Sequence, residues 1–182
     1  MCHCGSACQC NTEQYKLNTP FRKVWTDHIL YTREYILYEL YSLPHKADIV
    51  ARVMKNQEEI GAVFATYYGA EVGSQLTTLL KNHEEQGSNI VTSVKYGAPV
   101  DQLQLDWFDN ADLIVKLLVT INPYLHKSEM TEIFYKHLDQ VNKLVEETFK
   151  RRNTVPDFDM AIQHMLNLAN VLTFAISRQF NL

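Results

Sequence analysis

The sequence contains no cysteine after Cys10, although four of its first ten residues are cysteines. Glycine and proline are scarce, with 6 and 5 residues respectively in a chain of 182. The glycines are scattered, so no glycine-rich loop is present to bind a phosphate group. No apolar run reaches the roughly 20 residues needed to cross a bilayer, and no secretory signal opens the chain. We therefore expect a cytoplasmic protein without a membrane span.

Strong positive charge is also missing. The net charge is −4, and Lys and Arg residues form no basic stripe, so nucleic acid is not an expected partner. Hydrophobic residues make up 46% of the chain and charged residues 21%, which is typical of a globular domain and not of a disordered one. Strand signals are absent as well, because no segment alternates apolar and polar residues over several positions.

Apolar residues instead recur every three to four positions over most of the chain, which is the period of one helix face. We predict an all-α, up-down helical bundle. The five long helices are expected over residues 20–41, 70–96, 100–120, 128–152 and 155–180, and two short ones over 45–54 and 56–67. Pro20 suits a first helical turn with Thr19 as its cap. Residues 1–19 are thus interpreted as a cysteine-rich leader and linker, and residues 20–182 as one bundle domain.

Two segments of the chain resemble each other. WTDH (residues 25–28) matches WFDN (residues 107–110), and the helix over 79–91 matches the helix over 133–145, so that His83 falls on His137. A duplication of helix pairs would explain the match, and such pairs often build metal sites in bundle cores. The alternative is chance similarity between short helical segments.

Four histidines lie on the apolar faces of four different predicted helices: His28, His83, His137 and His164. Asp112 is also expected to face inward. Middle positions of antiparallel helices meet in one layer, so these side chains can converge. Several imidazoles with one carboxylate suit zinc, iron or copper.

The alternative interpretation is a layer of buried, hydrogen-bonded polar groups without metal, which would also include Arg33, Asn110 and His164. In that layer Arg33 pairs with Asp112 or another acid. The sequence contains no Glu-x-x-His, the pattern that carboxylate-bridged di-iron bundles use. A core metal site would therefore hold a single ion among histidines.

The leader itself has the spacing of a metal site. Its four thiols follow the pattern Cys-x-Cys-x3-Cys-x-Cys, formed by Cys2, Cys4, Cys8 and Cys10, with His3 as a fifth candidate ligand. Two close cysteine pairs can surround Zn(II) or share Cu(I), and the small residues 5–7 would allow a tight reversal between them. The alternatives are a redox-labile tail, or S-acylation of Cys2 and Cys4.

Several strings carry a resemblance to a known family: WTDHILYTR (25–33), NQEEIG (56–61), LLKNH (79–83) and WFDNAD (107–112). Over most of residues 21–181 the chain resembles small helical proteins of bacteria and large viruses, often labelled "acetylglutamate kinase", and distantly the hemerythrin- and ferritin-like bundles. The resemblance implies an inner polar layer formed by His28, Arg33, His83, Asp112 and His137. His164 lies outside the family's pattern.

Kinase activity is not expected from the residues, because an amino-acid kinase needs a parallel sheet and phosphate-binding glycine loops. The sequence favours a metal-binding bundle that handles, stores or senses a metal ion. One alternative is a metalloenzyme that performs oxygen or peroxide chemistry at the core histidines. Another is a non-catalytic structural or interaction protein, with a protein partner or a second copy of the chain bound to it.

Overall fold

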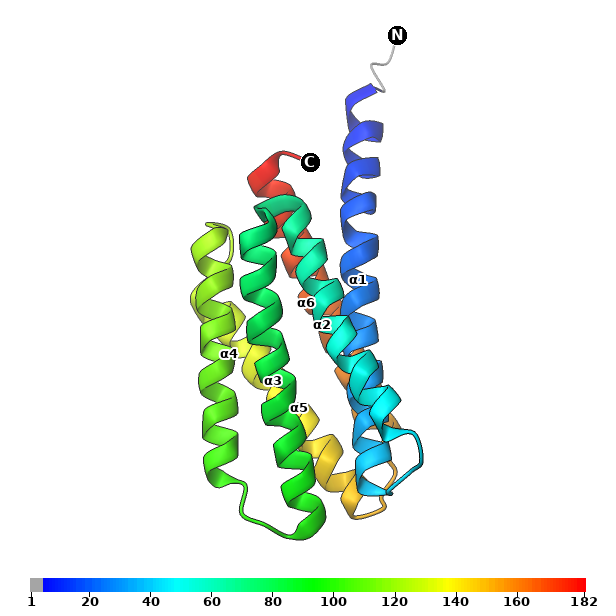
Figure 1. Cartoon of the computed structure of the whole chain (residues 1–182). Helices are drawn as coiled ribbons and strands as arrows, with labels where there is room; N and C mark the ends of the chain where they lie inside the picture. Colours follow the sequence, from blue (N-terminus) through cyan, green and yellow to red (C-terminus); the bar gives the residue numbers. More distant parts are fainter. Residues whose placement is uncertain (1–4) are drawn as a thin grey trace.

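The computed structural model describes the backbone of residues 5–182 and the side chains of residues 14–182. Over that range the chain forms six α-helices and no strand (Figure 1). The helices are α1 (Gly5–Leu40), α2 (Lys46–Tyr68), α3 (Ala70–Tyr96), α4 (Asp101–Ile121), α5 (Lys127–Phe149) and α6 (Val155–Phe180). The predicted all-α bundle is therefore confirmed, while the predicted number of helices is wrong.

The two short helices predicted over 45–54 and 56–67 are one continuous helix, α2. The polar residues in the middle of this segment do not interrupt it, because they find partners inside the bundle. Asn56 is fully buried and donates from Nδ2 to the Val24 carbonyl on α1 at 3.0 Å. Gln57, also fully buried, donates to the Val53 carbonyl one turn earlier.

The first helix also differs from its prediction, since α1 begins at Gly5 and contains Pro20 in its interior. Thr19 does not cap a helix there; its hydroxyl donates to the Tyr15 carbonyl one turn earlier, at 2.9 Å. Proline removes one backbone hydrogen bond, and fully buried Leu17 and Phe21 on either side of it hold the helix through that position. The predicted helix start at Pro20 and the predicted reversal over 5–7 are therefore wrong, because residues 5–19 already belong to α1.

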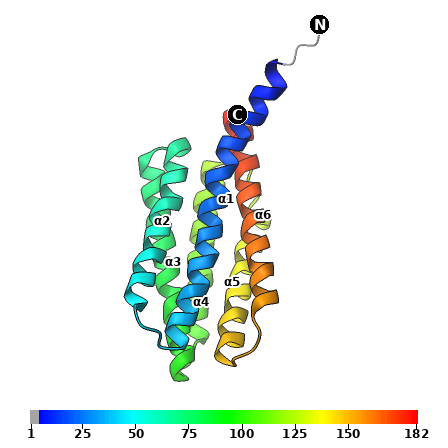
Figure 2. The ribbon, with the colours of Figure 1, turned by 90° about the vertical axis from the view of Figure 1, so that its right-hand side faces the viewer.

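The proposed leader ligands lie outside the described side chains. The backbone of Cys8 and Cys10 is helical, and their side chains lie outside the described ones. Cys2, His3 and Cys4 precede the described residues altogether. The first turns of α1 project beyond the other five helices, as both views of the ribbon show (Figures 1 and 2).

The six helices form a closed ring in chain order, each contacting the next, with α6 packed against α1. The odd-numbered helices α1, α3 and α5 also contact one another, so their facing sides form the inside of the bundle. Figure 2 shows α1 between the α2–α3 side and the α5–α6 side. Among residues 5–182, no helix combines the length and apolar composition needed to cross a bilayer.

Helices α2 and α3 approach each other closely at two glycines. A Cβ atom added to Gly61 would lie 2.6 Å from the Gly73 carbonyl oxygen, and one added to Gly73 would lie 2.7 Å from the Gly61 carbonyl oxygen. Both distances are shorter than the closest contact that a nonbonded carbon and oxygen tolerate. The two backbones therefore pack at a distance that only glycine permits at these positions.

Candidate metal centre in the bundle core

The three inner helices each contribute one buried histidine to the same layer. His28 on α1 and His83 on α3 are each 3% exposed, and His137 on α5 is 5% exposed. The Nε2 atoms of His28 and His137 lie 3.4 Å apart. The rings of His83 and His137 stack with centroids 6.3 Å apart. The tertiary structure thus brings together three residues that are far apart in the sequence.

The orientation of His83 is set by helix α4. Its Nδ1–H donates to the Asn110 side-chain oxygen at 2.9 Å, and the Asn110 amide donates in turn to the Leu79 carbonyl. Trp107, one turn before Asn110, donates from its indole nitrogen to the His83 carbonyl at 2.9 Å. Because Nδ1 carries the proton, Nε2 of His83 holds a lone pair. This nitrogen is buried and has no hydrogen-bond partner among the described residues.

Glu84 on α3 is the acid that faces this layer, and sequence reasoning missed it. Its side chain is only 11% exposed, and Oε1 lies 3.4 Å from Nδ1 of His28. The sequence did contain a signal for an inward position of Glu84. This residue lies four positions after Leu80 and seven before Val91, both of which are buried. Such spacing places it on the edge of the same inward stripe.

Burial decides the charge of every group in the layer. It raises the pKa of the Glu84 carboxyl to about 8. It lowers the pKa of His28 to about 3 and that of His83 to about 4, and it holds the pKa of His137 well below its usual value. The imidazoles are therefore neutral near pH 7, which is the form that ligates metal ions.

Asp112 does not join the histidines, so its predicted inward position is wrong. It is exposed on α4 and accepts a hydrogen bond from the Tyr135 hydroxyl at 3.1 Å. Its neighbour Ala111 is the residue that is fully buried. Asn110 and Ala111 are both buried, so the inner face of α4 lies between them, and at 100° per residue Asp112 falls on the outer side. Among the described side chains Arg33 forms no ion pair with Asp112; its guanidinium carbon lies 4.6 Å from the centre of the Phe158 ring on α6.

His164 on α6 is buried, with 8% of its surface exposed, but it is hydrogen-bonded to backbone. Its Nε2–H donates to the Ile133 carbonyl on α5 at 2.8 Å. Burial lowers its pKa too. Because Nε2 of His164 is already hydrogen-bonded, this histidine joins α6 to α5 and does not face the histidine layer as a free ligand.

Two small cavities flank the histidine layer, and both are lined by His28, His83 and His137. The larger, of about 20 Å³, is also lined by Glu84 and by the hydroxyl-bearing Thr32, Tyr35 and Ser88. The smaller, of about 10 Å³, is otherwise apolar. A volume of this size holds one water molecule or one ion.

The contacts of the layer agree with the internal repeat. The repeat aligns His28 with Asn110 and His83 with His137. In the structure, His28 contacts His137 and Asn110 contacts His83. These two contacts are equivalent under the repeat, since each joins the first helix of one copy to the second helix of the other.

As the side chains of residues 14–182 are oriented, no three His, Cys, Asp or Glu residues among them are positioned to share one metal ion. No family model, no curated protein and no solved structure matches the chain.

Proposed function

We propose that the protein is a metal-binding helical bundle that holds one transition-metal ion between the Nε2 atoms of His28, His83 and His137, with Glu84 beside Nδ1 of His28. The distance between the Nε2 atoms of His28 and His137, 3.4 Å, carries this proposal. Two nitrogens bound to one tetrahedral zinc at about 2.0–2.1 Å lie about 3.4 Å apart. Without metal this contact is a long N–H···N hydrogen bond between the two imidazoles, and its length equals the spacing of two ligands of one ion.

His83 also has the hydrogen-bond pattern of a metal ligand. Ligating histidines in proteins almost always donate their second ring N–H to an oxygen, which fixes the tautomer. Asn110 supplies that oxygen to Nδ1 of His83 and leaves Nε2 for an ion. His83 must shift toward the His28–His137 pair to reach the ion, while Glu84 stays beside Nδ1 of His28, where a ligating histidine commonly has a carboxylate.

Glu84 would supply the charge that the site needs. A buried carboxylate is costly unless a cation accompanies it, and the three neutral imidazoles provide none. A bound divalent ion would stabilise the ionised carboxylate, and the carboxylate would reduce the net charge buried with the ion. Three imidazoles, one of them oriented by a carboxylate, suit zinc, iron or copper.

The leader is a second proposed site, which rests on its sequence. Cys2, Cys4, Cys8 and Cys10, with His3 optional, would bind Zn(II) or Cu(I) through thiolates. Because Cys8 and Cys10 lie about 200° apart around a helix, such a site requires the first turns of α1 to unwind. No thiol outside the leader can contribute to that site. Together the two sites would fit a cytoplasmic protein that handles, stores or senses a metal ion.

An enzymatic role at the core is the second candidate, and the polar cavity beside the histidines favours it. With a volume of about 20 Å³, it admits one water-sized molecule. Only a substrate as small as dioxygen or peroxide could therefore reach the metal without opening the bundle.

Metal analysis of protein purified without a histidine tag tests the proposal and separates the two sites. In a variant with all four cysteines replaced by serine, we expect one ion per chain after loading with zinc. Adding His137→Leu should abolish that binding, while adding His164→Gln, a matched buried histidine, should preserve it. Loss of all metal in the cysteine variant would assign binding to the leader, and equal losses in both histidine variants would contradict a core site. Absence of metal in every form would leave a structural or interaction role.

A further inference from the structure

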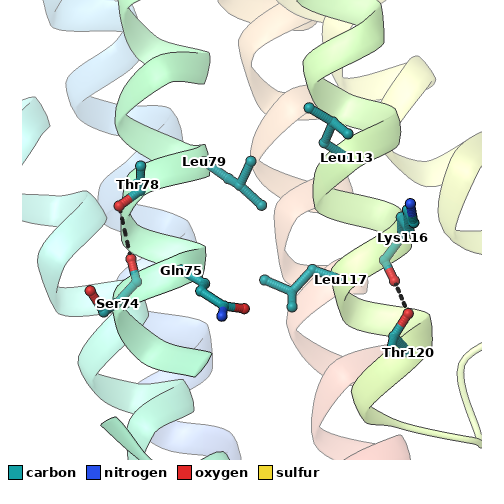
Figure 3. A pocket seen from close by; sticks show the side chains of 8 residues that line it. All are labelled: Ser74, Gln75, Thr78, Leu79, Leu113, Lys116, Leu117 and Thr120. Carbon is teal, nitrogen blue, oxygen red and sulfur yellow. Dashed lines mark hydrogen bonds between the residues drawn. The ribbon is translucent and has the colours of Figure 1, made fainter. Parts of the chain in front are cut away.

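A surface groove of about 510 Å³ runs between the first half of α3 and the second half of α4. Figure 3 shows Leu79 of α3 and Leu113 and Leu117 of α4 pointing into the space between the two helices. Leu113 is 52% exposed, although its surroundings are apolar. The groove therefore presents apolar surface to solvent on the outside of the bundle.

The hydroxyl groups around this groove are already engaged within their own helices. Thr78 donates to the Ser74 carbonyl at 3.0 Å, and Thr120 donates to the Lys116 carbonyl at 2.6 Å (Figure 3). These donors are satisfied and do not require a polar ligand. The groove is thus better suited to an apolar side chain of a protein than to a polar metabolite.

The outer face of α4 carries charges of opposite sign in its two halves. A stripe with helical spacing runs along this face through Gln102, Asp106, Asp109, Leu113, Lys116 and Thr120, all of them exposed. Its first half is acidic, and its second half carries Lys116. Such a stripe is complementary to itself when two copies lie antiparallel, since the acidic half of each then faces the lysine of the other.

We propose that a second copy of this chain docks along α4, related by a twofold axis, to form a homodimer. The axis passes between Asp112 and Leu113, so that Asp109 faces the partner's Lys116 and the two copies of Leu113 meet. Each Leu113 enters the other copy's groove beside the partner's Leu79. This inference does not depend on the bound metal, because α4 contributes its opposite face to the histidine layer.

Charge exchange in the full-length chain tests this arrangement by sedimentation over a range of concentrations. The wild type should dimerise with a dissociation constant on the order of micromolar, as expected of a small interface. Asp109→Lys and Lys116→Asp should each weaken dimerisation by about 10-fold or more, because each places like charges together at two symmetric positions. An equimolar mixture of the two variants should dimerise again, since both contacts then join opposite charges.

Two further variants examine the groove. Leu113→Asp should abolish the dimer, while Met160→Asp, a matched change at an exposed apolar residue of α6, should preserve it. Circular dichroism should show equal helicity in both. A monomeric wild type at the highest concentrations, a mixture that does not recover, or a dimeric Leu113→Asp variant would each overturn the proposal.

Discussion

Replacing Glu84 by glutamine should change how the stability of the metal-free protein depends on pH. Glu84 is largely buried and is surrounded by His28 and Tyr35 of α1, His83 of α3 and His137 of α5. Glutamine has nearly the same shape but does not titrate. The substitution therefore removes the ionisation of one buried group and leaves the packing almost unchanged.

The size of the pH effect on the free energy of unfolding follows from the pKa of Glu84, which burial raises from an ordinary value of 4.5 to about 8. Between these values the folded protein retains a proton that the unfolded chain has released, so stability falls as pH rises. Each pH unit in this interval removes about 1.4 kcal/mol. The full effect, reached above the folded pKa, has a ceiling of about 5 kcal/mol. Glu84→Gln lacks this decline.

The histidines act in the opposite direction. Burial lowers the pKa of His28 from 6.5 to about 3 and that of His83 to about 4. Below the ordinary value the unfolded chain binds protons that the folded protein does not, so stability is lost as pH falls. The wild type should therefore be most stable near the ordinary histidine pKa, 6.5, and less stable on both sides of it. Glu84→Gln should retain the acid decline only.

Urea unfolding followed by circular dichroism, in the presence of a chelator, measures this difference. The two proteins should have nearly equal stability at about pH 4.5, and the variant should exceed the wild type by several kcal/mol at about pH 8. Glu85→Gln, at the exposed neighbouring position, should follow the wild type at every pH. A constant difference between Glu84→Gln and the wild type across this range would refute the assignment of Glu84 as a buried, protonated acid.

Two other substitutions test the hydrogen bond between Asn110 and His83 and the packing of α2 against α3. Asn110→Ala removes the oxygen that fixes the tautomer of His83, so zinc affinity, measured by chelator competition, should fall by about 10–100-fold. Asp112→Ala, on the outer face of the same helix, should leave zinc affinity unchanged. Gly61→Ala places a Cβ atom 2.6 Å from the Gly73 carbonyl oxygen, and urea unfolding should show a loss of about 1–3 kcal/mol; unchanged stability would show that α2 and α3 separate freely.

Helical periodicity determined the all-α bundle and the inward placement of its central histidines. A buried histidine repeats with its apolar neighbours every three to four residues, so the stripes around His28, His83 and His137 were visible in the sequence. Helical periodicity is a local signal, because it reports only on residues within a few turns of each other. It did not reveal that α1 continues through Pro20, because fully buried Leu17 and Phe21 on either side of the proline are buried only by contacts with other helices.

Only the tertiary structure decided which acid faces the histidines. Asp112 and Glu84 both lie at the edge of an apolar stripe, where a small rotation of the helix turns a side chain inward or outward. The packing of α4 buries Ala111 and exposes Asp112, whereas the packing of α3 against α1 brings Glu84 to 3.4 Å from His28. The contact between His28 and His137 joins residues 109 positions apart, and no local pattern encodes such a distance. Periodicity specifies a helix face, and the rotation of each helix is set by the neighbours that it packs against.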